Sequence, residues 1–192
     1  MKWFFSCFQL PTQSAKVVPS LENIHYKGAG ILFTDKINVL AGFQPNKRIP
    51  KITGIGGTRN GSEPLLDCAL RECLEELYDI SVIPEKLFAK LKEIFHEKKF
   101  FITGWYINYV FSFEDLKTIL KIAKRYKILS PVYDTLPTTI EDLLLKRKYS
   151  STAEIQSMVY LPIAALELRH NPIGHEFVQD IQILKDINKT SE

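Results

Sequence analysis

The spacing of apolar residues along the chain predicts where its helices and strands form. Between residues 63 and 78 the apolar positions lie three and four apart, which is typical of an amphipathic helix. Two short apolar runs, residues 28–34 and 37–42, flank a two-residue polar turn and predict a β-hairpin. A polar loop at residues 44–50 then leads into a short strand at residues 51–55. The helix is therefore expected to follow closely on a strand that ends at a pair of glycines.

The second half of the chain continues the alternation of strands and helices. Its most strand-like segment is residues 99–113, which is rich in aromatic and β-branched residues. Residues 87–95 are expected to pair with it as a second hairpin, around a turn formed by the sequence HEKK. The remaining expected elements are a helix at 114–126, a long excursion at 128–151 with a short helix at 140–148, a strand at 154–161, a short helix at 162–168 and a final helix after Pro172. Together these elements predict an α/β fold, in which a mixed β-sheet has helices on both faces.

The length and composition fit one folded domain with short appendages. The chain has 192 residues, of which 45% are hydrophobic and 24% charged, as is ordinary for a globular protein. We expect residues 1–22 to form an N-terminal arm or first strand, residues 23–170 the domain, and residues 171–192 a C-terminal helix packed on it. The apolar opening is too short for a signal peptide, and no stretch is long enough to span a membrane. Three cysteines without a CxxC pair indicate neither zinc nor disulfides, so we expect an intracellular protein, in the cytoplasm or the nucleus.

The net charge is only +3, but basic residues are concentrated in two segments. Such a concentration is either a solvated helix face or a surface that attracts a polyanion, such as RNA or a highly phosphorylated small molecule. The first segment carries Lys117, Lys121, Lys124, Arg125 and Lys127, and the second carries Lys146, Arg147 and Lys148. The charge pattern leaves both interpretations open.

The most informative chemistry lies in residues 57–79, where glycine, glutamate and arginine follow a fixed spacing. The order is Gly, five residues, Glu, seven residues, Arg-Glu, two residues and Glu-Glu. Residues three and four apart on a helix share a face, so Glu72, Glu75 and Glu76 present their carboxylates together. Arg71 is placed to pair with Glu75, but one arginine cannot neutralise three carboxylates. Mg²⁺ or Mn²⁺ can, because both prefer hard oxygen ligands.

The loop before this helix fits the same chemistry. Gly56 and Gly57 let the backbone come close to a metal ion and to phosphate oxygens. Glu63, at the start of the helix, can brace the loop by accepting its amide hydrogens. A solvated acidic helix face would explain the acidic residues, but it would not explain the glycines, the offset of Glu63 or the adjacent arginine.

Residues 57–79 resemble the sequence box of the Nudix hydrolase family. The resemblance implies an α/β/α sandwich with a mixed β-sheet. It also implies an enzyme that hydrolyses a pyrophosphate linkage, typically in a nucleoside diphosphate joined to another group. The segment departs from the family pattern at its end, where Tyr78 replaces a glycine and Asp79 an aliphatic residue. We expect this departure to alter the turn after the helix and to leave the metal ligands unchanged.

The resemblance also implies a role for each residue of the segment. Glu72 and Glu76 would bind Mg²⁺ or Mn²⁺ with help from the carbonyl of Gly56. Glu75 would be a further ligand or the partner of Arg71, and Arg71 and Glu72 belong to the expected catalytic set. The residues expected to support the loop are Glu63 and Gly57.

A second resemblance concerns the proton acceptor that such a reaction needs. The sequence TAEIQSMVYL resembles the pattern with which mRNA-decapping Nudix enzymes introduce a late strand. Carried over, Glu154 would be the general base or an additional metal ligand, with Tyr160 near the position of a tryptophan. An exposed glutamate at the start of a strand is the alternative interpretation, and Glu93 and Glu97 are rival bases.

The leading hypothesis is therefore a Mg²⁺-dependent Nudix pyrophosphohydrolase acting on a nucleotide-containing small molecule or on capped RNA. Decapping ranks narrowly first, because of the context of Glu154, the basic segments and the extra length of residues 128–151. Diphosphoinositol polyphosphates and free nucleotide derivatives are alternative substrates. A catalytically silent module that binds nucleotide or RNA is the non-enzymatic alternative.

Substrate selectivity is expected to lie outside the 57–79 segment. Lys47 and Arg48, in the polar loop at residues 44–50, are expected to bind substrate. Trp105 and Tyr106 would either stack on a base or belong to the core. The sequence shows no pattern from which an oligomeric state could be predicted.

Overall fold

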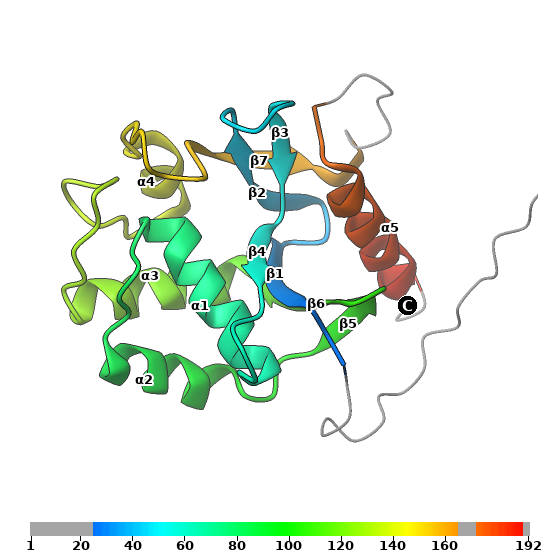
Figure 1. Cartoon of the computed structure of the whole chain (residues 1–192), viewed down its shortest axis with the longest axis horizontal. Coiled ribbons are helices and arrows are strands. Elements are labelled where there is room, and N and C mark those ends of the chain that lie inside the picture. Colours follow the sequence, from blue (N-terminus) through cyan, green and yellow to red (C-terminus); the bar gives the residue numbers. More distant parts are fainter. Residues whose placement is uncertain (1–24, 165–171, 190–192) are drawn as a thin grey trace, which may run out of the picture.

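In residues 25–164 and 172–189, which the computed structural model describes, seven strands form one mixed β-sheet (Figure 1). The strands are β1 (Gly28–Thr34), β2 (Asn38–Gln44), β3 (Lys51–Thr53), β4 (Ile55–Thr58), β5 (Phe100–Thr103), β6 (Tyr106–Ser112) and β7 (Ser157–Pro162). They run in the order β3-β2-β1-β6-β5, with β4 also paired to β1 and β7 also paired to β2. β1 is parallel to β6, and the other pairs are antiparallel.

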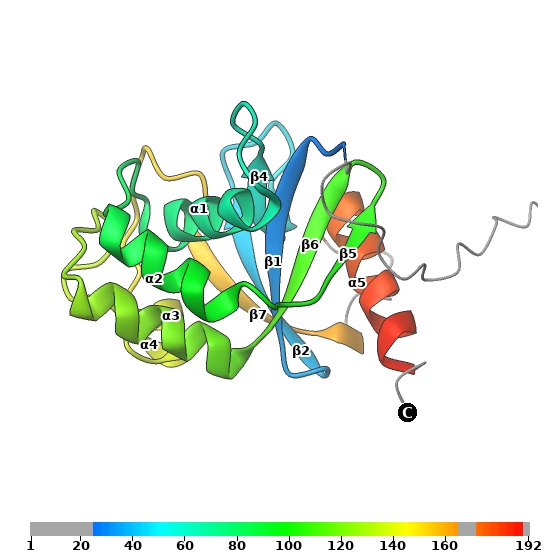
Figure 2. The same ribbon diagram turned by 90° about the horizontal axis from the view of Figure 1, so that it is seen from below.

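Helices cover both faces of this sheet (Figure 2). The helices are α1 (Leu65–Tyr78), α2 (Glu85–Phe95), α3 (Phe113–Arg125), α4 (Ile140–Leu145) and α5 (His175–Lys189). The first four lie on one side of the sheet, and α5 lies on the other. The larger hydrophobic core is on the α1 side, and a smaller core on the other side contains Phe177, Ile181 and Leu184 of α5. The predicted α/β architecture with a mixed sheet is confirmed.

The central strand β1 serves both cores because its side chains alternate. Ala29, Ile31 and Phe33 belong to the larger core, whereas Leu32 belongs to the smaller one. Every residue of β1 is buried, as is typical of a strand that is covered on both faces. The strand that leads toward the candidate site, β4, pairs with the first half of β1.

Residues 87–95, which the sequence pattern assigned to a strand, form most of α2, so that prediction was wrong. Leu87, Leu91 and Phe95 lie four residues apart and are buried in the larger core. A nine-residue apolar segment cannot be assigned from its apolar content, and here the spacing of four decides for a helix. Pro84 directly precedes the helix, where its missing amide hydrogen costs nothing.

The predicted long strand at residues 99–113 contains both strands of the hairpin. Gly104, with a φ of 59°, reverses the chain so that β5 and β6 pair with each other. β6 then leads directly into α3, which begins with a reciprocal cap. The Ser112 hydroxyl accepts the amide hydrogen of Asp115, and the Asp115 carboxylate accepts that of Ser112. The helix predicted at residues 114–126 is therefore confirmed, whereas the long strand is two short ones.

The later elements are shorter than the sequence predicts. The short helix expected at residues 140–148 is α4, which ends at Leu145. The strand expected at residues 154–161 is β7, so that residues 154–156 remain in a loop. The expected arm at residues 1–22 lies outside the described residues, as does most of the helix expected at 162–168. None of the helices in the part of the chain that the structure describes is long and apolar enough to cross a membrane.

Candidate active site

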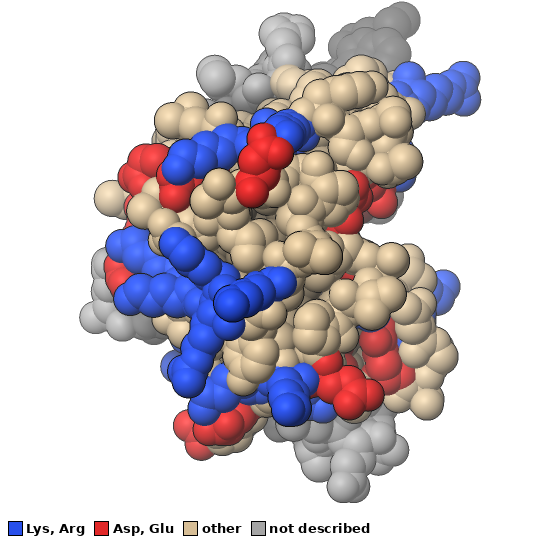
Figure 3. All heavy atoms as spheres, turned by 90° about the vertical axis from the view of Figure 1, so that its left-hand side faces the viewer, with Lys and Arg blue, Asp and Glu red and all other residues tan. Residues whose placement is uncertain are grey.

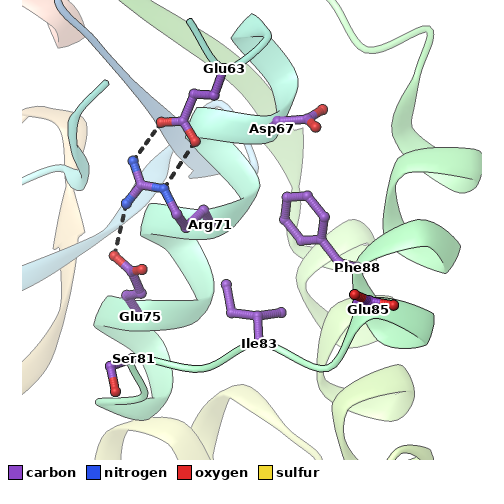
Figure 4. A pocket seen from close by; sticks show the side chains of 8 residues that line it. All are labelled: Glu63, Asp67, Arg71, Glu75, Ser81, Ile83, Glu85 and Phe88. Carbon is purple, nitrogen blue, oxygen red and sulfur yellow. Dashed lines mark hydrogen bonds and ion pairs between the residues drawn. The ribbon is translucent and has the colours of Figure 1, made fainter. Parts of the chain in front are cut away.

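Arg71 is the centre of a network of charged hydrogen bonds on α1 (Figure 4). Its Nε and Nη2 donate to the two carboxylate oxygens of Glu63, at 3.1 and 2.6 Å. Its Nη1 donates to Glu72 at 2.8 Å and to Glu75 at 2.9 Å. Nη2 also donates to the main-chain carbonyl of Thr58, at 2.8 Å. The expected pair of Arg71 and Glu75 is present, and the same guanidinium holds Glu63 and Glu72 as well.

Glu63 joins this network to the loop that precedes α1. Its Oε1 accepts the amide hydrogen of Asn60 at 2.8 Å. Its main-chain carbonyl accepts hydrogen bonds from Arg59 Nε, at 3.1 Å, and from the hydroxyl of Tyr26. Burial acts to raise the pKa of Glu63, but hydrogen bonds from Arg71 and Asn60 outweigh it and lower the pKa. Glu63 therefore stays ionised and braces the loop.

Gly56 and Gly57 of β4, just before this loop, lie against the carboxylates of α1. The amide of Gly56 donates to Oε2 of Glu76 at 2.6 Å. A methyl group at Gly57 would overlap the carboxylate of Glu72. Gly56 also has a φ of 152°, which favours glycine. The two glycines are therefore what allows Glu72 and Glu76 to lie directly against β4.

Burial raises the pKa of both Glu72 and Glu76, and the effect on Glu76 is large. For Glu72, hydrogen bonding and charge from Arg71 oppose the increase in the pKa. For Glu76, the Gly56 amide opposes it, whereas the nearby charges of Glu154 and Glu72 raise the pKa further. Two enclosed carboxylates that repel one another are costly to the fold unless a positive charge compensates them.

Glu154, in the loop before β7, belongs to the same group of charges. Its Oε1 accepts a hydrogen bond from Gln44 Nε2 at 3.0 Å and lies 2.7 Å from the ammonium nitrogen of Lys47. Its negative charge is one of those that raise the pKa of Glu76. The structure thus brings Glu154 and Lys47 to the carboxylates of α1, and Arg48 lies exposed in the same loop as Lys47.

The other residues considered from the sequence have local partners elsewhere. The rival bases Glu93 and Glu97 are exposed at the end of α2 and pair with Lys90 and His96. The hydroxyl of Tyr160 donates to Asp35 at 3.0 Å. The ring of Trp105 is 57% exposed, so it does not belong to the core.

Arg147, which the sequence presents only as part of a basic segment, ties the end of α1 to the loop that carries Glu154. Its Nη1 donates to the carbonyl of Leu77 at 2.7 Å, and its Nη2 to that of Glu76 at 3.0 Å. Nε and Nη2 also donate to the carbonyl of Ile155, at 3.2 and 2.8 Å. The last carbonyls of a helix have no partner within it, and this side chain supplies one. The sequence Lys146-Arg147-Lys148 does not indicate that its middle residue bonds to the end of α1.

The turn after α1 explains why the 57–79 segment can end without a glycine. Tyr78 remains in the helix and is fully buried, and Ser130 Oγ donates to its carbonyl at 2.6 Å. Asp79 then takes the left-handed conformation, with φ 54° and ψ 49°, and its amide donates to the carbonyl of Glu75 at 2.7 Å. Aspartate is one of the few residues that tolerate this conformation. The turn therefore comes one residue later than the glycine of the family pattern would place it. The carboxylates of Glu72, Glu75 and Glu76 keep their places on the helix.

The carboxylates fit a divalent cation in their chemistry, although protein donors hold them in the present arrangement. Within residues 25–164 and 172–189, no three His, Cys, Asp or Glu side chains are grouped closely enough to form a metal site. Glu72, Glu76, Glu154 and the carbonyl of Gly56 nevertheless offer oxygen atoms of the kind that Mg²⁺ and Mn²⁺ prefer. A cation there would favour the ionised forms of Glu72 and Glu76, whose pKa values burial raises.

No sequence-family model and no curated protein sequence matches the chain. Among solved structures, the chain is similar to a Nudix-family hydrolase from Clostridium perfringens, with 12% identity, 86% of this chain and 98% of that chain covered, and a TM-score of 0.37. It is also similar to RenU, a Nudix hydrolase from M. smegmatis. The two sequences are 12% identical, the match covers 86% of this chain and 88% of RenU, and the TM-score is 0.43. A third similar structure is a bifunctional NMN adenylyltransferase/ADP ribose pyrophosphatase from Francisella tularensis, in complex with AMP and a manganese ion. The two sequences are 15% identical, the match covers 85% of this chain and 42% of that chain, and the TM-score is 0.41. Likeness at this level carries no argument about activity, which has to come from the site.

Proposed function

We propose that the chain is a Nudix-type hydrolase that uses Mg²⁺ or Mn²⁺ to cleave the pyrophosphate bond of a nucleoside diphosphate linked to another group. The observation that carries the proposal is the enclosure of Glu72 and Glu76 against Gly56 and Gly57 of β4, with Arg71 bonded to Glu72. A helix face with a purely solvating role would leave its carboxylates in water, because enclosing them is costly. Their enclosure beside two glycines, where the backbone can come close to a metal ion and to phosphate, fits a metal-dependent phosphate site.

The residues of α1 and its loop prepare the cation site. Glu72, Glu76 and the carbonyl of Gly56 would hold the cation, which when bound neutralises phosphate charge and makes a water molecule more acidic. Arg71 keeps Glu72 and Glu75 in fixed positions through its hydrogen bonds. Because those bonds are charge-assisted, the carboxylates are ordered before substrate arrives.

Glu154 is the residue that we assign as proton acceptor for the attacking water. It is exposed, and it lies close enough to Glu76 for its charge to raise the pKa of that residue. Gln44 and Lys47 orient its carboxylate from one side. Lys47 and its exposed neighbour Arg48 would also contact the phosphates of the substrate.

Capped RNA is the substrate that we favour, because of a basic surface on the side where α3 and α4 lie (Figure 3). Several lysines of this region are neutralised by ion pairs, namely Lys117 with Glu114, Lys146 with Asp142 and Lys148 with Asp134. Four exposed cations make no ion pair with any residue in 25–164 or 172–189, and these are Lys121, Lys124, Arg125 and Lys127. A group of unneutralised cations on α3 and just after its end attracts the phosphate chain of RNA. A diphosphoinositol polyphosphate would satisfy the same catalytic residues and remains the competing substrate.

The proposal is tested by incubating the wild-type protein and Glu76→Gln with Mg²⁺ and a panel of substrates. The panel contains cap-labelled RNA, NDP-sugars, dinucleoside polyphosphates and diphosphoinositols. We expect the wild type to cleave at least one of them and Glu76→Gln to be about a hundredfold slower or worse. The exposed residue Glu93 provides a control, Glu93→Gln, that should match the wild type. A wild type that cleaves nothing, or a fully active Glu76→Gln, contradicts the proposal, and a silent binding module would show binding without cleavage.

Metal binding has a readout that does not depend on activity. Because a ligand that binds only the folded state stabilises it, Mg²⁺ at a concentration of about 100 times its Kd should add about 2.7 kcal/mol of stability. We expect millimolar Mg²⁺ to raise the melting temperature of the wild type and of Glu93→Gln, but not that of Glu76→Gln. Equal shifts in all three proteins would place the cation elsewhere.

A further inference from the structure

Tyr106 approaches the candidate site from the face of the sheet opposite to α1. It is the first residue of β6, and Asn108, two residues further along, donates its amide to Asp180 of α5 at 2.8 Å. Side chains two residues apart on a strand share a face of the sheet. Tyr106 therefore projects on the side of α5, whereas the carboxylates of Glu72 and Glu76 come from α1.

Three glycines make room for the ring of Tyr106. A methyl group at Gly28 would lie 2.8 Å from its Cε2, and one at Gly30 would lie 2.8 Å from its hydroxyl oxygen. A methyl group at Gly56 would overlap the same hydroxyl. Gly30 and Gly56 are direct partners across β1 and β4, so the two strands form a slot that any side chain would close. The ring lies along this slot, and its hydroxyl ends beside Gly56.

The hydroxyl at the end of the slot takes no part in the hydrogen bonding among the described residues. It makes no hydrogen bond to any residue of the described ranges 25–164 and 172–189. Tyr106 keeps part of its surface in solvent, unlike Tyr78, whose buried hydroxyl has no partner among the described residues. Buried polar groups that stabilise a fold are hydrogen-bonded within it. A rigidly placed donor that residues 25–164 and 172–189 leave unbonded is instead available to a ligand.

We propose that the Tyr106 hydroxyl donates a hydrogen bond to a phosphoryl oxygen of the substrate, beside Gly56 and Glu76. This inference rests on the proposed function and adds a substrate-contacting residue to it. None of the described residues supplies an acceptor to this donor, and an anionic phosphoryl oxygen beside Gly56 would supply one. Because the slot fixes the ring, little conformational entropy is lost when the bond forms.

The test compares Tyr106→Phe, which fills the slot but lacks the hydroxyl, with Tyr109→Phe. Tyr109 lies on the same strand with its side chain in the larger core, so it controls for loss of a hydroxyl from β6. We expect Tyr106→Phe to lower kcat/KM by about tenfold to a hundredfold for the substrate that the wild type cleaves, the range for a hydrogen bond to a charged group. Its melting temperature should match that of the wild type, and Tyr109→Phe should keep wild-type kinetics.

Binding of inorganic pyrophosphate in Mg²⁺, measured by calorimetry, separates this inference from the proposed function. An affinity at least about tenfold weaker for Tyr106→Phe than for the wild type supports the contact, even where no panel substrate is cleaved. Equal affinities with equal kinetics overturn the role of Tyr106 while the hydrolase proposal stands. Failure of the wild type to bind pyrophosphate also overturns it. If the wild type cleaves no substrate of the panel, the proposed function is contradicted. The pyrophosphate affinities of the wild type and Tyr106→Phe then decide whether Tyr106 contacts phosphate.

Discussion

The guanidinium of Arg147 is bonded to the main-chain carbonyl of Glu76, at 3.0 Å, on the last turn of α1. The same group is bonded at 2.8 Å to the carbonyl of Ile155, the residue after Glu154. One side chain thus holds together two carboxylate-bearing segments that are far apart in the sequence. The separation between Glu76 and Glu154 therefore depends on Arg147 as well as on the elements that carry them.

Replacing Arg147 by glutamine should affect both stability and catalysis. The carbonyls of Glu76 and Leu77 would lose charged donors, which we expect to cost about 2–3 kcal/mol of unfolding free energy. The loop that carries Glu154 would also lose its tie to α1, so kcat should fall while KM changes little. Arg147→Lys should be intermediate, because an ammonium cannot reach three carbonyls with fixed geometry. Urea unfolding and steady-state kinetics measure the two effects.

The neighbouring variant Lys146→Gln is the matched control for Arg147→Gln. Lys146 is exposed and pairs with Asp142 at 2.6 Å, so its loss should change stability by less than about 0.5 kcal/mol and leave kcat unchanged. If Arg147→Gln loses stability but keeps kcat, the residue has a structural role alone. If Arg147→Gln keeps both its stability and its kcat, the hydrogen bonds of Arg147 to the two segments contribute to neither.

Gly57→Ala should lower activity more than it lowers stability. Its methyl group would overlap the carboxylate of Glu72, which has to move away from the loop. We expect kcat to fall by about tenfold or more, since small displacements in a catalytic site are costly. Gly174→Ala is the control, because its methyl group would lie no closer than 3.4 Å to a neighbour. Steady-state kinetics and thermal melting of both variants measure the loss of kcat and the loss of stability. A fully active Gly57→Ala would show that the close approach of Gly57 to the Glu72 carboxylate is not needed for catalysis.

The part of the candidate site that is local in sequence could be predicted from the sequence. Arg71 and Glu75 are one helical turn apart, so their pairing follows from the spacing once the helix is recognised. The same holds for Glu63, whose offset places it at the start of that helix. The α/β fold was also predictable, because β1 and β2 are short continuous apolar runs, whereas the apolar residues of α1 lie three and four apart.

The contacts made by distant segments could not be predicted. Arg147 bonds to α1 from 70 residues further along the chain, and neither its neighbours nor its spacing mark it. Tyr106 depends on three glycines that lie on two other strands. The error at residues 87–95 is of another kind, because their apolar content fits a helix and a strand equally well, and only the four-residue spacing of Leu87, Leu91 and Phe95 indicates the helix.

Asp180 should make the protein less stable as the pH rises from about 4 to about 7. Burial raises its pKa to about 6 from an ordinary value of 3.8. The folded state therefore binds a proton more tightly than the unfolded state, and this stabilisation is present below pH 4 and lost as the pH rises through 6. Asp180→Asn keeps an acceptor for Asn108 and removes the charge, so at pH 8 it should be more stable than the wild type by at most about 3 kcal/mol. Urea unfolding across this pH range measures the difference.

Asp35 provides a control of opposite sign for Asp180→Asn. Although burial acts to raise its pKa, hydrogen bonds from Asn38 and Ile37 outweigh that effect and lower the pKa to about 2. Its stabilising effect is present at neutral pH and disappears as the pH falls through 2. Asp35→Asn should therefore be less stable than the wild type at pH 7, where Asp180→Asn is more stable. If the stability of the two variants relative to the wild type changed with pH in the same direction, the raised pKa of Asp180 would be contradicted.

Reversing two charges on α3 should weaken the use of long RNA without affecting the catalytic centre. Lys121 and Lys124 are exposed and make no ion pair with any residue of the described ranges, so Lys121→Glu with Lys124→Glu should leave the fold intact. We expect the KM for a capped RNA of some thirty nucleotides to rise by about tenfold or more at low salt, and its dependence on salt concentration to become shallower. The kcat/KM for a cap dinucleotide, which lacks the long phosphate chain that α3 is proposed to attract, should stay at the wild-type value. Lys36→Glu with Lys99→Glu reverses the same number of exposed charges elsewhere and should change neither quantity. Equal effects of the two pairs on long RNA would mean that net charge, not the α3 surface, governs RNA use.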